Sequence, residues 1–309
     1  MLNNKDNKYF QVAQGVWGMK LVFVNIYMIA NRRGSGNGWV LVDAGLKGSA
    51  KRIIEMAESL FGPGSRPKAI ILTHGHFDHI GALEELLIHW DVPVYAHALE
   101  IPYLTGLSSY PPADPLVGGG LMSLLSVFYP TSPIALGNRI KAINMYSGIH
   151  ELQEWKVIHT PGHSPGHISL FLPLNTTLIA GDALTTTQTE SAIYILNYIK
   201  KLSGPPKYFT TDWFAAENSV RTLVALQPRI VSSGHGQVLR GKELQFDLDN
   251  LLSNFEEDSI PASGRYVKQP AVADEYGVKF IPPFKSGFQL KIAISITAAL
   301  ITFLVMRNI

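Results

Sequence analysis

Apolar residues recur along the first hundred positions with two different periods. Short runs rich in β-branched and aromatic residues are typical of strands, and they lie at 25–30, 39–45, 68–73 and 93–97. Apolar residues that share one helical face predict amphipathic helices, and they lie at 49–62 and 82–90. Glycine and asparagine at 31–38 predict an antiparallel hairpin between two of the strands. The first part of the chain is therefore expected to alternate strand and helix.

The same alternation returns after residue 154. Strands are predicted at 155–160, 168–172, 177–182 and 229–236, and helices at 215–227 and 242–255. Two α/β halves are therefore expected, each with strands that end near a histidine-bearing loop.

Between the two halves, the segment from about 100 to 138 has no regular period. It is rich in proline, contains three consecutive glycines at 118–120 and carries an apolar patch at 121–130. Insertions of this kind often form lids or substrate walls. A short helix that packs on the core between loops is an equally good interpretation.

Charge and composition narrow the classes of function. The chain has 309 residues, 26 of them basic and 24 acidic, and it contains no basic run of five or six residues. A nucleic-acid partner is therefore not expected. Cysteine is absent, which excludes disulfides, thiolate nucleophiles and cysteine-based zinc sites.

Histidine is concentrated in one short segment. Of the 10 histidines in the chain, three lie in residues 73–81, whose sequence is THGHFDHIG. Imidazole nitrogen and carboxylate oxygen are common ligands of zinc. His74 and His76 can point the same way from an extended segment, and Asp78 and His79 come where that segment turns into a helix. One loop gives an incomplete ligand set, because each metal needs three or more protein ligands.

The missing ligands follow later strands. His163, Asp182 and His235 each lie at the end of a predicted strand, in a loop that contains glycine. Glycine lets the backbone approach closely and turn sharply, which a site between two sheets requires. The predicted ligand groups are His74, His76 and His163 for one metal, Asp78, His79 and His235 for a second, and Asp182 as the bridge. A single metal at this position is the alternative.

The order of these residues resembles the signature of the metallo-β-lactamase fold superfamily. The resemblance rests on the H-x-H-x-D-H motif at 74–79, on the Asp-Ala-Gly at 43–45, and on the downstream His, Gly-Asp and Gly-His. It covers residues 16–255 and implies an α/β fold, an αββα four-layer sandwich with the metals at one edge. It also implies hydrolysis by a metal-bridged hydroxide. Aspartate at position 182 is similar to the glyoxalase II, lactonase and phosphodiesterase branches. It differs from the antibiotic-degrading branches that have cysteine there, so β-lactamase activity is not expected.

The leading interpretation is a binuclear metal-dependent hydrolase that acts on a small ester, thioester or lactone. Two zinc ions per chain are expected, with iron or manganese as alternatives, because affinity order alone does not set metal identity in a cell. Asp78 is predicted to act in catalysis as well as in metal binding, since it can hold the nucleophile's proton and pass it to the leaving group. The apolar insertion and the near-neutral charge favour an uncharged or amphiphilic small-molecule substrate. Candidate oxyanion donors are Tyr194, Tyr198, Lys207 and Tyr208.

Three other functions use the same residues. A phosphodiesterase or nuclease is one, although the absence of a basic cluster argues against long nucleic acids. A mononuclear-iron oxygenase similar to the persulfide dioxygenases is another, and the complete second ligand group argues against it. A non-catalytic binding module would be expected to have lost ligands, and none is missing.

Other polar residues near the motif have a supporting role in this interpretation. Asp43 is expected to orient a ligating histidine or its loop. His167 lies four residues after His163, but Pro161 and Pro165 make a helix there improbable. His167 is therefore expected to support its loop by hydrogen bonding. The remaining histidines are interpreted as structural or solvated: His89, His97, His150 and His159.

The composition changes after Phe255, where the predicted catalytic domain of residues 1–255 ends. Residues 256–287 are rich in proline, glycine and charge and predict an extended arm or linker.

Residues 288–309 are strongly apolar. The 19 residues at 288–306 would span about 28 Å as a helix, close to the hydrocarbon core of a bilayer at about 30 Å. A C-terminal membrane anchor is predicted, with a helix buried on protein as the alternative. Lys285 and Lys291 before the uncharged run at 292–306, against Arg307 after it, favour a cytoplasmic catalytic domain. The alternative is that the protein is soluble in the cytoplasm.

Overall fold

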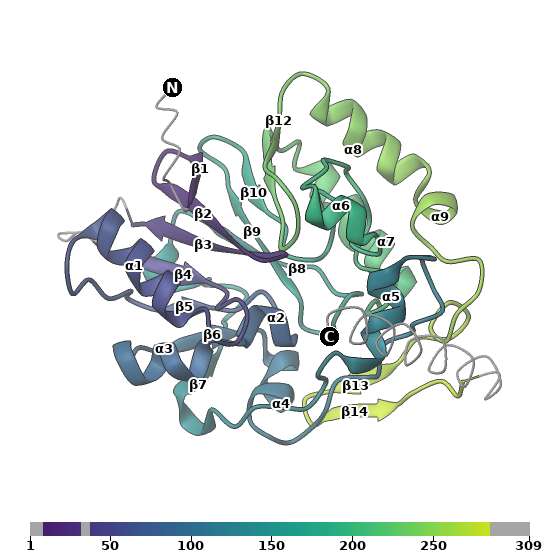
Figure 1. The fold of residues 1–309 in the computed structure, drawn as a ribbon, viewed down its shortest axis with the longest axis horizontal. Coiled ribbons are helices and arrows are strands. Elements are labelled where there is room, and N and C mark those ends of the chain that lie inside the picture. Colours follow the sequence, from purple (N-terminus) through teal and green to yellow (C-terminus); the bar gives the residue numbers. More distant parts are fainter. Residues whose placement is uncertain (1–8, 32–37, 285–309) are drawn as a thin grey trace, which may run out of the picture.

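The computed structural model describes residues 9–31 and 38–284. Two large sheets form its centre, and Figure 1 shows them between two groups of helices. The first sheet has its strands in chain order: β1 (Phe10–Ala13), β2 (Val16–Leu21), β3 (Val24–Ala30), β4 (Trp39–Val42), β5 (Ile70–Ile71), β6 (Val94–Ala96) and β7 (Ile140–Ala142). The second sheet has the order β12 (Leu239–Arg240), β11 (Ile230–Ser232), β10 (Thr177–Ile179), β9 (Ile168–Leu172) and β8 (Lys156–His159).

Helices cover the outer faces of the sheets and connect them. The α-helices are α1 (Ala50–Phe61), α2 (Phe77–Ile80), α3 (Leu83–Trp90), α4 (Ile101–Leu104), α5 (Leu121–Leu125), α6 (Ala192–Leu196), α7 (Trp213–Ala225), α8 (Leu244–Ser253) and α9 (Phe255–Asp258). Short 3-10 helices are η1 (Ala98–Glu100), η2 (Ser126–Phe128), η3 (Gly137–Arg139) and η4 (His150–Leu152). α1 and α3 pack outside the first sheet, and α7 and α8 pack outside the second (Figure 1).

Alternate residues of each strand enter different apolar layers, as the two-residue period of a strand requires. In β3, Ile26 and Met28 pack towards α1 and α3, whereas Tyr27 and Ile29 pack between the sheets. β9 and β10 divide in the same way between the layer inside the sandwich and the layer under α7 and α8. The layers therefore follow the order helix, sheet, sheet, helix.

The structure confirms the α/β fold that the hydrophobic pattern predicts. β3 and β4 pair antiparallel, as expected for the hairpin around 31–38. The helix predicted at 49–62 is α1, which ends before Gly62, where φ is 99°. β5 spans only two residues, fewer than the predicted 68–73. Its pairing stops there because the Thr73 N–H donates to the Asp43 side chain instead of a neighbouring strand.

The insertion at 100–138 consists of short helices and loops. Two of the three glycines at 118–120 are explained by a close approach to Glu190. A Cβ on Gly118 would lie 2.3 Å from Glu190 Cγ, and a Cβ on Gly120 would lie 1.9 Å from the Glu190 carbonyl oxygen. Because no side chain fits there, the insertion can lie directly against the segment that follows Asp182.

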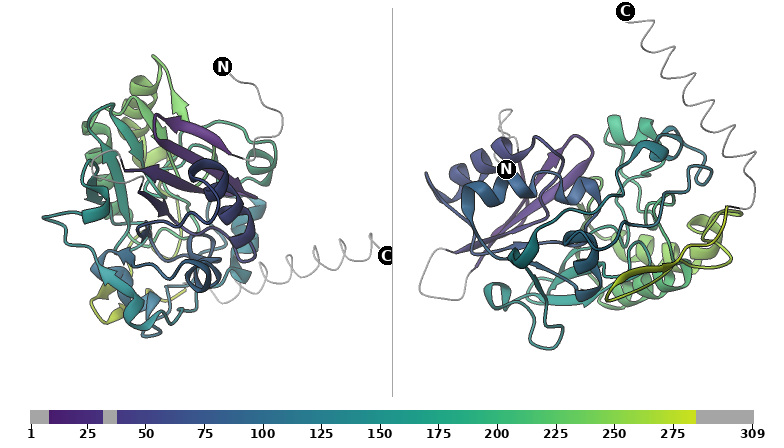
Figure 2. Two further views of the ribbon diagram at one scale, coloured as in Figure 1. Left: turned by 90° about the vertical axis from the view of Figure 1, so that its left-hand side faces the viewer. Right: turned by 90° about the horizontal axis from the view of Figure 1, so that it is seen from below.

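The arm predicted at 256–287 contains all of α9 except its first residue, and a hairpin of β13 (Val272–Asp274) and β14 (Gly277–Phe280). Figure 2 shows this yellow hairpin beside the blue-green insertion. The Arg265 N–H donates to Asp114 Oδ2 at 2.6 Å, and the Val278 N–H donates to Ser108 Oγ at 3.0 Å. Over its described residues the arm is therefore hydrogen-bonded to the insertion.

The segment predicted as a membrane anchor, 288–309, lies outside the described residues. Within the described ranges, no helix is both long enough and apolar enough to cross a membrane.

Candidate metal centre

Strand directions explain why ligand residues far apart in the chain meet. β8 and β10 both pair antiparallel with β9, and β11 runs parallel to β10. The carboxyl ends of β8, β10 and β11 therefore lie at one edge of the second sheet. His163, Asp182 and His235 follow these three strands in turn. The THGHFDHIG loop follows β5 of the first sheet and faces the same edge.

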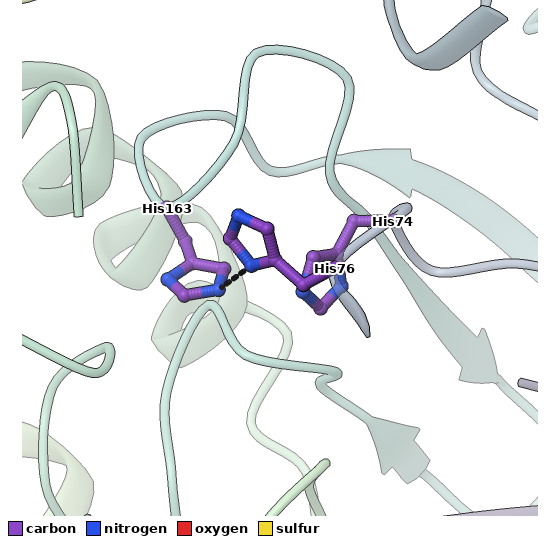
Figure 3. Close-up of side chains that lie close together, drawn as sticks. All are labelled: His74, His76 and His163. Atoms are coloured by element: carbon purple, nitrogen blue, oxygen red, sulfur yellow. Dashed lines mark hydrogen bonds between the residues drawn. The ribbon is translucent and has the colours of Figure 1, made fainter. Parts of the chain in front are cut away.

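The first predicted ligand group, His74, His76 and His163, comes together in the structure. One ring nitrogen from each residue lies within 4.8 Å of the others, and all three side chains are buried. Figure 3 shows these rings, with His76 Nδ1 and His163 Nε2 2.9 Å apart. Two nitrogens bound to one tetrahedral zinc lie about 3.3 Å apart, so a shift of a few tenths of an ångström would accommodate the ion.

The second predicted group, Asp78, His79 and His235, also converges within 4.8 Å. Asp182 lies between the two groups. Its Oδ2 is 3.0 Å from His235 Nε2, 3.6 Å from His163 Nε2 and 3.7 Å from His79 Nε2. The carboxylate thus contacts histidines of both groups, as a bridging ligand would.

The donor atoms themselves fit divalent cations. His74 Nε2, His79 Nε2 and Asp182 Oδ1 are buried without a hydrogen-bond partner. A buried polar atom left unpaired costs about 1–3 kcal/mol, and three such atoms in one cluster are unusual in a folded protein. Imidazole and carboxylate together are a common ligand set for zinc, so a bound cation would satisfy these atoms.

Neighbouring acceptors fix the orientation of the histidine rings. His79 Nδ1 donates to Asp43 Oδ2 at 2.8 Å, and His235 Nδ1 donates to the Phe23 carbonyl oxygen at 2.8 Å. The Thr73 N–H and hydroxyl both donate to Asp43 at 2.8 Å. Nε2 of His79 and of His235 is therefore left as the atom that faces the centre. Asp43 has the orienting contacts that the sequence predicts, to the His79 ring and to its loop.

His167 does not face the centre. Its Nδ1 lies 2.8 Å from Thr160 Oγ1, and its Nε2 accepts the Asp182 N–H at 2.8 Å. Both ring nitrogens are engaged, so His167 supports the loop as predicted.

The pKa values of the histidines fall into two classes. Burial and mutual repulsion lower the pKa in one class, and nearby carboxylates raise it in the other. Burial lowers the pKa of His76 to about 3 and lowers the pKa values of His74 and His163 well below their usual range. Burial also opposes protonation of His79, but the carboxylates of Asp43, Asp182 and Asp78 outweigh it and raise the pKa of His79. Because metal ligands must be unprotonated, binding at His79 would release a proton.

Aromatic side chains enclose the centre. Besides the ligands, the pocket is lined by Pro206 and by five aromatic residues: Phe23, Phe77, Tyr129, Tyr208 and Phe209. Tyr129 comes from the insertion, which therefore contributes one wall of the pocket, as one of the two interpretations of that segment expects.

Two of these rings pack on ligand rings. Phe209 stacks on His76 with 4.6 Å between ring centroids, and Phe23 lies nearly parallel to His235 at 6.1 Å. Phe23, Phe77 and Phe209 were not singled out as lining residues from the sequence. Phe77 could have been found from its place inside the motif, but no local pattern marks Phe23 or Tyr129.

Of the four candidate oxyanion donors, only Tyr208 lines the pocket. The Tyr198 hydroxyl donates to the Gly236 carbonyl oxygen at 3.3 Å, and Lys207 Nζ donates to the Asp258 carbonyl oxygen at 2.8 Å. Lys201 lies over the Tyr194 ring, 5.8 Å from its centroid. The other three candidates therefore do not line the pocket: Tyr194, Tyr198 and Lys207.

Comparison with known proteins identifies the class. The family model described as the metallo-beta-lactamase superfamily matches residues 19–235. The probable metallo-hydrolase YflN of Bacillus subtilis is 44% identical over 242 residues, which cover 78% of this chain and 91% of that protein. The chain belongs to the metallo-beta-lactamase superfamily, which confirms the resemblance seen in the sequence.

More distant relatives and several solved structures are also similar to this chain. The hydroxyacylglutathione hydrolase GloC of Haemophilus influenzae is 27% identical over 144 residues, 47% of this chain and 60% of that protein. The crystal structure of the B3 metallo-beta-lactamase BLEG-1 has a TM-score of 0.51 at 26% identity, covering 72% of this chain and 92% of that one. A beta-lactamase domain protein from Burkholderia ambifaria shares the fold, with a TM-score of 0.57 at 20% identity, covering 80% of this chain and 75% of that one.

Proposed function

We propose that the protein is a hydrolase that uses two divalent cations, zinc in the first place, to cleave a small ester, thioester or lactone. The position of Asp182 carries the proposal, because its Oδ2 lies within 3.7 Å of histidines from both ligand groups. His74, His76 and His163 would hold one cation, and Asp78, His79 and His235 would hold the other. Residues 1–255 would form the catalytic domain.

The chain's own residues would complete the chemistry. A bound divalent cation supplies Lewis acidity and makes water nucleophilic near neutral pH. Asp78 is buried at the start of α2 and borders the pocket, so its carboxylate can hold the proton of the attacking water and pass it to the leaving group. The Tyr208 hydroxyl can donate a hydrogen bond to the oxyanion that forms on the substrate.

Three observations support an acyl substrate. The pocket walls are aromatic, which favours an apolar or amphiphilic acyl group over a polyanion. Two relatives of the chain are named hydroxyacylglutathione hydrolases. Position 182 is aspartate, unlike the antibiotic-degrading branches that have cysteine there, which argues against the substrates of those branches.

A substrate panel on metal-quantified protein tests the proposal. We expect turnover of one or more aryl esters, thioesters or lactones, and a fall to background in His76→Ala. Hydrolysis of bis-nitrophenyl phosphate alone would instead indicate a phosphodiesterase. A protein that carries one iron and consumes oxygen would contradict the hydrolase.

A further inference from the structure

Glu100 is a carboxylate buried between the two loops that carry the first ligand group. It is the last residue of η1 and the first residue of the insertion, and none of its surface is exposed. An ionised carboxylate in such a place needs strong hydrogen-bond donors to offset its loss of hydration. The identity of those donors indicates what the residue does.

The donors come from both ligand loops. The Gly75 N–H donates to Glu100 Oε2 at 3.0 Å, and Gly75 lies between His74 and His76. The Gly166 N–H and the Ser164 hydroxyl each donate to Oε1 at 2.8 Å, and Ser164 directly follows His163. One carboxylate therefore joins the loop of two ligands to the loop of the third.

Tyr110 of the insertion completes this arrangement. Its hydroxyl donates to Glu100 Oε2 and accepts the Gly75 N–H at 2.9 Å. Its ring contacts His76, with 4.5 Å between centroids. The insertion is thereby connected to the metal centre as well as to the pocket wall.

Two glycines allow the loops to approach this closely. A Cβ on Gly166 would lie 2.8 Å from Glu100 Cγ, and a Cβ on Gly75 would lie 2.7 Å from the Tyr110 hydroxyl oxygen. The backbone N–H groups can only donate, so both oxygens of the carboxylate are needed as acceptors.

We propose that Glu100, with Tyr110, is a positioning residue that sets the distance between the His74–His76 loop and the His163 loop, and thereby the affinity of the centre for metal. The inference rests on the proposed function, because it takes these histidines as ligands. Residues that orient metal ligands typically contribute about 10- to 100-fold to metal affinity.

Glu100→Gln is the most direct test. The amide keeps the shape of the side chain, but its NH2 group must face one of the two backbone N–H donors, so one loop loses its acceptor. We expect the affinity for Zn²⁺ to fall about 10- to 100-fold, measured by competition with a chromogenic chelator. The matched control is Asp114→Asn. Asp114 is also a buried carboxylate of the insertion, but it accepts the N–H groups of Leu116 and Arg265. Its substitution should leave Zn²⁺ affinity unchanged.

Two milder variants remove single hydroxyl groups. Ser164→Ala and Tyr110→Phe should each weaken Zn²⁺ binding several-fold. The double variant Glu100→Gln/Tyr110→Phe should lose less Zn²⁺ affinity than the two single losses combined, because residues that share one hydrogen-bond network are not additive.

The outcomes separate this inference from the proposed function. Unchanged Zn²⁺ affinity in Glu100→Gln, with a loss of unfolding free energy like that of Asp114→Asn, would show a purely structural role and overturn the inference. If Glu100→Gln does not fold, unchanged affinity in both hydroxyl variants overturns it. A wild-type protein that binds no divalent cation would overturn both the inference and the proposed function.

Discussion

A substitution of Tyr208 tests one part of the proposed chemistry by itself, the hydrogen bond to the substrate oxyanion. Burial, followed by the nearby Tyr129 and the carboxylates of Glu190, Asp78 and Asp182, raises its pKa well above the usual range. The hydroxyl therefore remains protonated and can donate throughout the physiological pH range. We expect Tyr208→Phe to lower kcat about 10²- to 10³-fold with little change in KM, measured on a substrate identified by the panel.

Tyr194→Phe is the control for this substitution, since Tyr194 lies outside the pocket and its loss should leave kcat unchanged. Wild-type kcat in Tyr208→Phe on every hydrolysed substrate would remove Tyr208 from the mechanism.

At the scale of residues, the predictable part of the site is the part with a local signature. The four motif residues stand within six consecutive positions, and His163, Asp182 and His235 each follow a recognisable strand with glycine beside them. Glu100 has no such signature. Its partners lie 25 and 66 positions away along the chain, and only the packing of the loops brings them together.

At the scale of elements, periodicity decided what could be predicted. α1 repeats its apolar residues on one face, so the sequence predicts the helix at 49–62. The hairpin of β13 and β14 has no buried alternation, because β13 is exposed or half-buried along its length. Those strands depend on each other and on the Ser108 contact, neither of which a local pattern can show.

The junction of β6 and η1 gives a prediction about pH. His97 precedes η1, its Nδ1 accepts the Leu99 N–H at 3.2 Å, and its ring stacks on His159 at 4.0 Å. Burial, and then repulsion by His159, lowers the pKa of His97 from 6.5 to about 4. The folded state therefore favours the neutral ring, and below pH 6.5 the unfolded chain binds more protons. This contribution to stability is complete above pH 6.5 and is lost as the pH falls towards 4.

His97→Gln cannot take up that proton. In metal-free protein, we expect the free energy of unfolding in urea to fall less between pH 7 and pH 4.5 in the variant than in the wild type. The same fall in both proteins would show that His97 does not contribute to acid sensitivity.

At the scale of the whole molecule, the candidate centre joins the two halves of the sandwich. The THGHFDHIG loop follows β5 of the first sheet, whereas His163, Asp182 and His235 follow strands of the second sheet. A cation bound by both would stabilise the folded chain as a unit, because a ligand that binds only the native state shifts the folding equilibrium.

The fold class was predictable because both halves show the same strand and helix rhythm. The contacts across the pocket were not, because they depend on how the insertion packs.

Metal content is the measurement that tests the central claim most directly. We predict that the full chain, dialysed against Zn²⁺ and then against metal-free buffer, retains two zinc ions per chain by elemental analysis. His163→Ala and His235→Ala should each retain fewer. His89→Ala, at an exposed position of α3, should retain two. A wild-type chain that retains no zinc, or ligand variants that retain as much as the wild type, would contradict the account.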